Sequence, residues 1–387
     1  MDWSLISQRR SRLAVSISDI LDEHGPFTLS SLMQYLKESD IPGPFPMHDS
    51  IKGAKWLGEG AQFQVYGRHF LVEKDFEAFD KPYLDPGRPW GKWNQIETTM
   101  ECVAVKRAKI LAPQVPQGSK PLTDLTRHAV GINQLRDTIQ EVLCLTSPPL
   151  RQHPNIVKLL AWGYDNHEER GDNSFSPLLF IEQATMSLGV LCRNSEIPTG
   201  VKQHLCRGTA SGIKALHEYF IVHGDVKPDN VLVFASRDHF SCTAKIADFG
   251  HSVRNFNQNT LTPEVAPQGT EGWSAPELRN QQSLRTDMLY KCDIWSLALT
   301  IWSVLSRRGE KPHLSKCHRP GEFPFECEGT DVPWSLLQIL CKPLAEMVVL
   351  DPIDRIAHVE NILTALELMS HKLTSEEKIM YENQGNT

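Results

Sequence analysis

The stretch HGDVKPDN, residues 223–230, limits what this chain of 387 residues can fold into more than any other segment. It places two carboxylates, a lysine and an amide between a helical pattern, KQHLCRGTASGIKALHEYF, and a short apolar strand, VLVF. Such a polar run is either a solvated turn or a catalytic loop held between two rigid elements. Further along, IADFG places Asp248 at the end of another expected strand. A solvated turn does not predict that second motif, so we favour a catalytic loop.

The composition is typical of a soluble intracellular protein. A net charge of −7 provides no basic surface for a nucleic-acid polymer. The nine cysteines, scattered from Cys102 to Cys341 with no Cys-x-x-Cys pair, indicate reduced thiols. Cys317 beside His318 falls short of the four ligands of a structural zinc site. We see no signal peptide, and the apolar run LALTIWSVL is too short for a membrane span, so we expect a cytoplasmic or nuclear protein.

The pattern of secondary structure changes along the chain. Strand patterns, including a glycine hairpin, dominate up to about residue 182, and helical patterns dominate afterwards. The strand candidates are 51–67, 102–110, 155–164 and 177–184. The helix candidates are 131–146, 200–220, 288–306, 334–348 and 357–371. A strand-rich part followed by a helix-rich part predicts an α+β fold of two lobes, with a ligand in the cleft between them.

Residues 1–46 are predicted to form a small helical extension. Apolar residues recur at helical spacing in 13–21 and in 29–36, and the prolines of 41–46 end any helix. The extension either packs on the main body or presents a helix to a partner. A polar, proline-containing stretch at about 68–100 is predicted to be an irregular insertion, either a docking site or a solvated loop.

The order of the motifs resembles the catalytic domain of eukaryotic protein kinases of the serine/threonine type. A glycine turn, GEGAQFQV, is followed by a strand lysine in VAVK, an acidic helix, the HGDVKPDN loop and DFG. The resemblance covers residues 51–372 and implies a bilobal kinase-like fold. We expect a small antiparallel β-rich N-lobe with one key helix at about 51–182. A larger, mainly helical C-lobe is expected at about 185–372, followed by a polar tail at 373–387.

The resemblance implies which residues bind ATP. Gly58 and Gly60 match glycines whose backbone approaches the phosphates, while Phe63 stands where a third glycine is usual. The backbone carbonyl of Glu182 and the amide of Ala184 would bond the adenine edge. The other positions implied to contact the nucleotide are Leu57, Val65, Ala104, Lys106, Leu232 and Asp248.

Lysine and metal chemistry follow from the same resemblance. Lys106 matches the lysine that binds the α- and β-phosphates, and Glu141 matches its partner on the helix. Asp137, one helical turn earlier, is the alternative partner. Asn230 and Asp248 match two Mg²⁺ ligands, and hard oxygen donors suit that cation.

The catalytic loop itself matches position by position. Asp225 matches the catalytic base that orients the substrate hydroxyl, and Lys227 matches the lysine that neutralises the γ-phosphate in serine/threonine kinases. Thr270, in GTEGWSAPE (269–277), matches the threonine that contacts both of them. That segment resembles the platform for a substrate peptide.

Several further residues are implied to be structural. His223 is expected to pack against Phe249 rather than act as a base. Asp293 is implied to anchor the catalytic loop, and Glu277 to form a buried ion pair with Arg355.

Gly224 departs from the family pattern, which usually has arginine there to bind a phosphate on the activation segment. Glycine supplies no charge, so we expect activity that does not depend on activation-segment phosphorylation. Ser252, Thr260 and Thr262 remain candidate phosphosites for other purposes.

The implied function is ATP- and Mg²⁺-dependent transfer of the γ-phosphate to serine and threonine hydroxyls of protein substrates. A pseudokinase scaffold is the alternative, favoured by Phe63 and Gly224 but opposed by the presence of every matched catalytic and metal-binding residue. A small-molecule kinase is disfavoured by the peptide platform. A partner of the N-terminal helices is also left open.

Overall fold

The structure is a computed structural model that describes part of the chain. The described residues are 29–39, 41–46, 55–59, 63–72, 99–108, 136–166, 175–235, 242–254, 269–279, 284, 286–312, 325 and 330–373. The features predicted from the sequence that lie outside them are the apolar run at 13–21, Gly60, residues 73–98 of the insertion, Thr260, Thr262, the Cys317–His318 pair and the tail from 374.

The described residues belong to two compact units, and each is considered by itself. One, the sheet unit, contains the described residues up to 108 together with 158–166 and 175–183. The other, the helical unit, contains 136–157 and the described residues from 184 onward.

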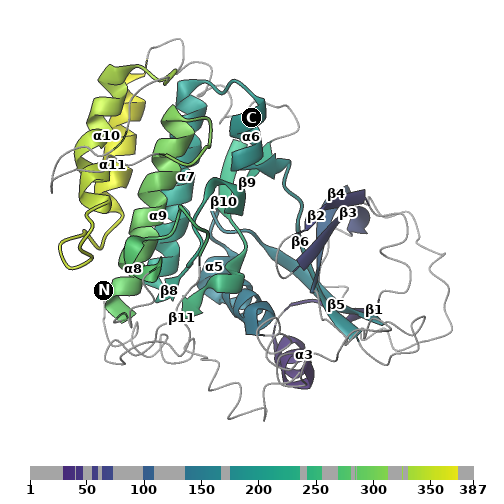
Figure 1. The fold of residues 1–387 in the computed structure, drawn as a ribbon. Coiled ribbons are helices and arrows are strands. Elements are labelled where there is room, and N and C mark those ends of the chain that lie inside the picture. The colour runs from purple at the N-terminus through teal and green to yellow at the C-terminus, as the bar shows by residue number, and fades with distance from the viewer. Residues whose placement is uncertain are drawn as a thin grey trace, which may run out of the picture. The chain divides into compact units, whose positions relative to one another are not determined.

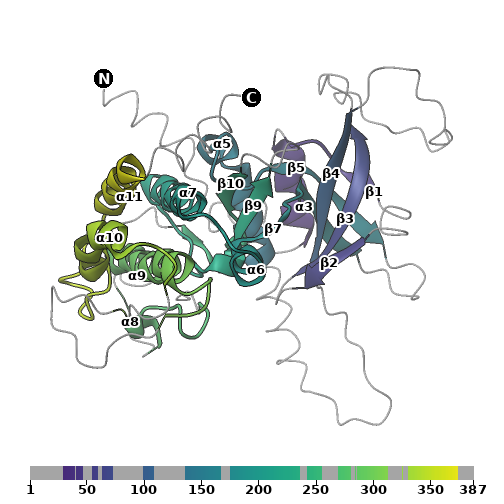
Figure 2. The same cartoon turned by 90° about the horizontal axis from the view of Figure 1, so that it is seen from above.

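The sheet unit is built on six strands in the order β1-β5-β6-β4-β3-β2 (Figures 1 and 2). The strands are β1 (Phe45–Pro46), β2 (Lys55–Glu59), β3 (Phe63–Val72), β4 (Thr99–Ala108), β5 (Leu159–Asn166) and β6 (Phe175–Glu182). Neighbouring strands are antiparallel except β1, which runs parallel to β5. Alternating apolar residues form its core, which consists of Val103, Val105, Leu178 and Phe180. The strand patterns read from the sequence are therefore confirmed.

Part of the predicted N-terminal extension is built into this unit. Helix α3 (Leu29–Glu38) buries Leu36 to 1% exposure, and Ile41 beyond it is 4% exposed. The Trp162 backbone N–H donates to the Pro42 carbonyl at 3.0 Å, next to the pairing of β1 with β5. Of the two interpretations of this segment, the structure shows packing on the body for α3. The domain boundary at residue 46 stays a prediction.

The helical unit contains the long helices predicted from the sequence. Helix α7 lies beside α9, and α10 and α11 pack together next to them (Figure 1). The helices are α5 (Pro148–Arg151), α6 (Leu188–Asn194), α7 (Thr199–Glu218), α8 (Pro276–Arg279), α9 (Thr286–Ser306), α10 (Trp334–Met347) and α11 (Glu360–Lys372). Residues 136–146 are also helical. The predicted combination of an antiparallel sheet followed by a mainly helical region is confirmed.

Helix α9 is largely buried in its unit. Its Trp295 and Trp302 are at most 2% exposed, because apolar residues occur on every face of the helix. The helix that contains the run LALTIWSVL is longer than the run itself, and its residues 288–306 are long and apolar enough to cross a membrane by length and composition alone. Within the described residues, 83% of the apolar window is buried, as in the core helix of a globular protein.

Two small sheets frame the loop that follows α7. One has the order β10-β9-β7 and the other pairs β11 with β8. Their strands are β7 (Met186–Ser187), β8 (Ile221–Val222), β9 (Val231–Ala235), β10 (Cys242–Ile246) and β11 (Val253–Arg254). The short helical turns η3 (Pro228–Asn230) and η4 (Phe249–His251) follow β8 and β10.

Backbone hydrogen bonds attach residues 136–157 to this unit. The Val157 N–H donates to the Ile246 carbonyl at 3.0 Å, and the Ile246 N–H donates to the Asn155 carbonyl at 2.8 Å. The Asn155 side chain also donates to the Ala244 carbonyl at 2.8 Å. The segment that follows the helix of Glu141 and α5 is therefore fixed to strand β10.

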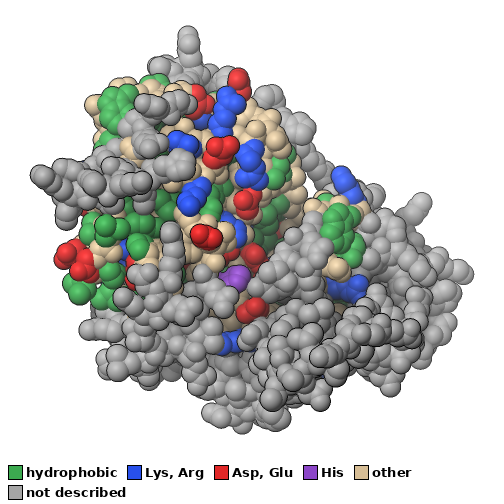
Figure 3. Space-filling model, viewed as in Figure 1, with side chains coloured by type: hydrophobic (Ala, Val, Ile, Leu, Met, Phe, Trp, Pro, Cys, Tyr) green, Lys and Arg blue, Asp and Glu red, His purple; other side chains and the backbone are tan. Residues whose placement is uncertain are grey.

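Charged side chains of both signs are interspersed over the described part of the face in Figure 3. This mixture agrees with the modest net negative charge of the chain.

We predict that Leu36→Ala lowers the free energy of unfolding of the sheet unit by about 2–5 kcal/mol, because it leaves a cavity under α3. The matched control is Lys37→Ala on the same helix, whose side chain is exposed. Chemical denaturation of the full chain provides the measurement. Equal effects of the two substitutions would show that α3 does not contribute its apolar face to the unit.

Candidate functional site

The loop at 223–230 is anchored from below by one buried carboxylate. Asp293 on α9 is 1% exposed and accepts the backbone N–H of His223 at 2.7 Å and that of Gly224 at 2.9 Å. It also bonds Nε2 of His217, in the last turn of α7, at 3.0 Å. The predicted anchoring role of Asp293 is confirmed, and two helices together position the start of the loop.

The ring of His223 is fully occupied by structural contacts. The Asp225 N–H donates to Nδ1 at 3.2 Å, so Nδ1 accepts, and Nε2 carries the hydrogen that reaches the Ala247 carbonyl at 3.0 Å. The ring also packs on Phe249 with centroids 5.4 Å apart. The prediction that His223 packs and bonds in this region, rather than acting as a base, agrees with this geometry.

Asp225, Lys227, Asn230 and Thr270 form a hydrogen-bonded cluster. The Lys227 ammonium donates to Oδ2 of Asp225 at 2.6 Å and to Oγ1 of Thr270 at 2.5 Å. The Asn230 amide nitrogen donates to the Asp225 carbonyl at 2.8 Å and to Oδ2 at 3.0 Å. These bonds leave Oδ1 of Asp225, which is buried, without a hydrogen bond among the described residues. That oxygen can accept a hydrogen bond from a substrate hydroxyl.

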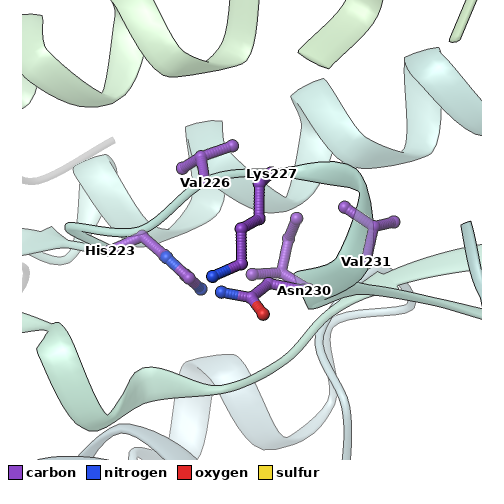
Figure 4. A pocket seen from close by; sticks show the side chains of 6 residues that line it. His223, Val226, Lys227, Asn230 and Val231 are labelled. Carbon is purple, nitrogen blue, oxygen red and sulfur yellow. The ribbon is translucent and has the colours of Figure 1, made fainter. Parts of the chain in front are cut away.

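A small pocket lies at this cluster (Figure 4). The Lys227 ammonium and the Asn230 amide converge there, and the His223 ring points toward the same place. Its lining residues are His223, Val226, Lys227, Asn230, Val231 and Ile246.

The electrostatics of the cluster favour an ionised Asp225. Burial, the largest single influence, raises the pKa of this carboxyl. Hydrogen bonds from Lys227 and Thr270, together with the charge of Lys227, outweigh burial and bring the pKa below its ordinary value. Asp225 is therefore charged at neutral pH.

Asp248 is held next to this loop in an unusual backbone conformation. Its φ of 67° lies in the left-handed region, which is uncommon for a residue other than glycine and often marks functional sites. The Ala247 N–H donates to the Asn230 carbonyl at 3.0 Å. Strand β9 begins directly after Asn230 and pairs with β10, which ends directly before Ala247. The structure thus brings the segments of Asn230 and Asp248 together.

The donor set of Asn230 and Asp248 fits a hard divalent cation. The Asn230 nitrogen is engaged with Asp225, so its amide oxygen is the atom available to a ligand. An amide oxygen and a carboxylate are ligands that Mg²⁺ accepts, with water or phosphate oxygens completing its shell.

The segment 269–277 packs tightly on the loop. Gly269 has a φ of 56°, and a Cβ there would lie 3.1 Å from the Gly224 carbonyl oxygen and would clash with the Ser274 hydroxyl. That hydroxyl donates to the Thr270 carbonyl at 2.8 Å, which holds Thr270 beneath Lys227. Only glycine fits at residue 269 without a shift of Ser274.

The end of this segment is fixed by a buried ion pair. Glu277 meets Arg355 through Nη1 at 2.5 Å and Nη2 at 3.2 Å, with side chains 5% and 0% exposed. Arg355 also donates to the carbonyls of Val349 and Lys291, each at 2.9 Å. The guanidinium is thus well compensated despite its burial, and the predicted pair is confirmed.

The predicted nucleotide residues of the sheet unit lie on neighbouring strands. Lys106 on β4 is 6% exposed and is opposite Val65 on β3 and Leu179 on β6. Two residues before it, and so on the same face of the strand, Ala104 is 5% exposed. Gly58 is opposite Val65 next to a register shift in β2, and Leu57 is 40% exposed.

The remaining predicted residues are divided between the units. Glu182 ends β6, where its carboxylate accepts the Lys158 N–H at 2.8 Å. Ala184, and Leu232 on β9, belong to the helical unit. Glu141 is fully buried on the helical residues 136–146, whereas Asp137 is only half-buried.

Sequence reasoning did not assign roles to three residues that the structure brings to the site. His217 bonds Asp293, Ser274 bonds Thr270, and the Cys292 thiol donates to Glu277 Oε1 at 3.3 Å. The signal for His217 was its position in the last turn of the helix that leads into the loop. The Ser274 bond lies within the segment 269–277, and the Cys292 bond joins α9 to the end of that segment.

We predict that Lys227→Met raises the pKa of Asp225, because burial is then opposed by fewer hydrogen bonds and charges. In the wild type the lowered pKa stabilises the fold above the carboxyl's ordinary value of 3.8, and this stability is lost as the pH falls through the folded pKa. In the variant the raised pKa destabilises the fold most at neutral pH. Melting temperatures of both proteins should therefore differ more at pH 7 than at pH 4.5. A difference that stays constant with pH would contradict the prediction.

Comparison with known proteins agrees with this geometry. The protein kinase domain profile matches residues 125–318. The chain is 31% identical to mitogen-activated protein kinase kinase kinase MCK1 of Pyricularia oryzae over 213 residues, which is 54% of this chain and 12% of that protein. It is 27% identical to mitogen-activated protein kinase kinase kinase ANP1 of Arabidopsis thaliana over 252 residues, 61% of this chain and 35% of that protein.

A third relative is serine/threonine-protein kinase CST20 of Candida albicans, 30% identical over 197 residues, 50% of this chain and 14% of that protein. The chain thus spans between 12% and 35% of the length of these relatives. The profile match covers half of the chain, including the loop of Asp225 and the segment of Asp248, and on this evidence the chain belongs to the protein kinase domain family.

Proposed function

We propose that this chain transfers the γ-phosphate of ATP to serine and threonine hydroxyls of proteins, with Mg²⁺ as the metal. The observation that carries the proposal is the Lys227 ammonium bridging Asp225 and Thr270 at 2.6 Å and 2.5 Å. A positive charge fixed beside a hydroxyl-orienting carboxylate is suited to a transition state that depends on positioning and charge stabilisation. The similarity to a serine/threonine-protein kinase and to two mitogen-activated protein kinase kinase kinases supports the substrate class.

In this proposal Asn230 and Asp248 hold Mg²⁺, which neutralises charge on the phosphate oxygens when it is bound. Asp225 orients the substrate hydroxyl through its buried Oδ1. Lys106, positioned by Glu141, binds the inner phosphates. The remaining nucleotide contacts are those proposed from the sequence, namely Leu57, Gly58, Gly60, Val65, Ala104, Glu182, Ala184 and Leu232.

The proposed partners are protein substrates, and the proposed location is the cytoplasm or nucleus. In support, Cys144, Cys192, Cys206, Cys242, Cys292 and Cys341 are free thiols, and all of these except Cys242 and Cys341 are buried. Free buried thiols suit a reducing compartment.

We predict that Asp225→Asn lowers kcat with a generic basic protein substrate by about 10²–10⁴-fold, because the amide no longer orients the hydroxyl as a charged acceptor. Asp229→Asn is the matched control, since Asp229 lies in the same loop but is exposed and pairs with Arg193. Transfer of label from γ-labelled ATP in Mg²⁺ buffer provides the measurement, with Asp248→Ala as a second inactive variant. Incorporation that is equal in the wild type and both variants would indicate a pseudokinase and a contaminating activity.

We further propose that activity does not require a phosphate on the activation segment. Gly224 precedes the catalytic Asp225 with a φ of 82°, a left-handed conformation that glycine adopts without steric cost. Its N–H is fixed by Asp293, so the loop is held by a carboxylate of the protein itself. Glycine offers no cation to a phosphate, and the fixed backbone supports a loop that is ordered without one.

Phosphatase treatment tests this second proposal. We predict that the dephosphorylated protein, verified by mass spectrometry, retains at least half of the kcat of the untreated protein. The reason is that residue 224 supplies no cation for a phosphate to pair with. Heat-inactivated phosphatase serves as the control. A loss of tenfold or more that returns on rephosphorylation would overturn the proposal.

A further inference from the structure

A buried contact joins the helix of Glu141 to the segment that follows Asp248. The Cys144 Sγ lies 3.1 Å from the Ser252 Oγ, and the two residues are 108 positions apart in the chain. Cys144 is 0% and Ser252 3% exposed, so water does not compete for this hydrogen bond. We call this pair the Cys144–Ser252 tether.

Each end of the tether is close in sequence to a residue of the proposed site. Cys144 is three residues after Glu141, which makes the two neighbours on the same side of the helix. Ser252 is four residues after Asp248 and directly follows the turn η4. The tether therefore connects the element that positions one site residue with the element that carries the proposed metal ligand.

The backbone around Ser252 is attached to the loop on its other side. The Ser252 N–H donates to the Phe249 carbonyl at 3.0 Å, and Val253 pairs with Val222, one residue before His223. Backbone bonds thus fix the segment against the catalytic loop, and the side chain of Ser252 fixes it against the helix at 136–146. Without the Ser252 hydroxyl, the attachment of this segment to the helix at 136–146 would lose its polar contact.

We propose that Cys144 and Ser252 are positioning residues, whose tether keeps the segment of Asp248 in register with the helix of Glu141. The proposal rests on the proposed kinase function. The tether also determines the effect of modifying Ser252, which is a candidate phosphosite by its sequence. Because the hydroxyl is buried and bonded, a phosphate of charge about −1.5 to −2 at this position would break the tether. Phosphorylation of Ser252 is thus inhibitory rather than activating.

The kinetic experiment uses single and double variants of the full chain. Ser252→Ala and Cys144→Ala should each lower kcat/KM by about three- to tenfold, the effect of one hydrogen bond of ordinary net strength. The double variant should be no worse than either single one, since both remove the same contact. Cys144→Ser, which can still bond Ser252, should retain at least half of the wild-type value. Ser252→Asp should lower kcat/KM by about a hundredfold or more.

The matched control is Ser303→Ala, which removes a fully buried hydroxyl that bonds the Thr300 carbonyl at 2.8 Å within α9. It should change the melting temperature about as much as Ser252→Ala does. The concentration of Mg²⁺ that gives half-maximal activity should rise several-fold in Ser252→Ala and remain unchanged in Ser303→Ala, because only the former displaces Asp248. A purely structural role for Ser252 would leave that concentration unchanged as well.

Hydrogen exchange supplies a readout that needs no activity. In Ser252→Ala and in Cys144→Ala, amides of 246–254 should exchange at least several-fold faster than in the wild type, while those of α10 and α11 remain unchanged. An inactive wild type would refute the kinase proposal, and the exchange data would still decide whether the tether exists. An active wild type with unaltered kinetics and exchange in both alanine variants, or an active Ser252→Asp, would overturn the positioning role.

Discussion

The catalytic loop depends on the carboxylate of Asp293. This group accepts two consecutive backbone N–H donors, from His223 and Gly224, and also bonds His217. A buried carboxylate is costly unless its oxygens are bonded in this way. Here the bonds fix the backbone immediately before Asp225, so the direction in which Asp225 presents its oxygens is set by α9 rather than by the loop.

Charge and burial are balanced differently at two carboxylates, that of Asp225 in the site and that of Glu277 in the supporting ion pair. Asp225 is stabilised in its charged form by one ammonium and several hydrogen bonds, yet keeps a buried oxygen for another donor. Glu277 has no such spare capacity, since Arg355 and Cys292 occupy it. The first arrangement serves binding and the second serves rigidity. Both carboxylates lie in the helical unit, where the segment that ends at Glu277 holds Thr270 next to Lys227.

Much of the fold was predictable because the long elements have strong local patterns. Helices α7, α9, α10 and α11 coincide with the predicted segments to within three residues at either end. In α7, α10 and α11 the signal is apolar periodicity over ten or more residues, and in α9 it is a long run that is apolar on every face. The loop residues Asp225, Lys227 and Asn230 were found because their order with DFG is specific. The packing of α3 into the sheet unit was not decided by its sequence, because an amphipathic helix fits a body or a partner equally well. The attachment of residues 136–157 to β10 was likewise not predicted, since its backbone hydrogen bonds involve groups common to every residue.

By itself the sequence determined which chemical groups the chain brings to a phosphate and a hydroxyl, since residue type and order define the donor set. The tertiary structure alone decided which of them are charged and which contacts hold them. Asp225 is ionised because of where Lys227 and Thr270 lie, and Ser252 is tied to Cys144 rather than open to solvent. The physical reason is that burial and hydrogen-bond geometry depend on segments far apart in the chain, whereas a motif records only its own neighbourhood.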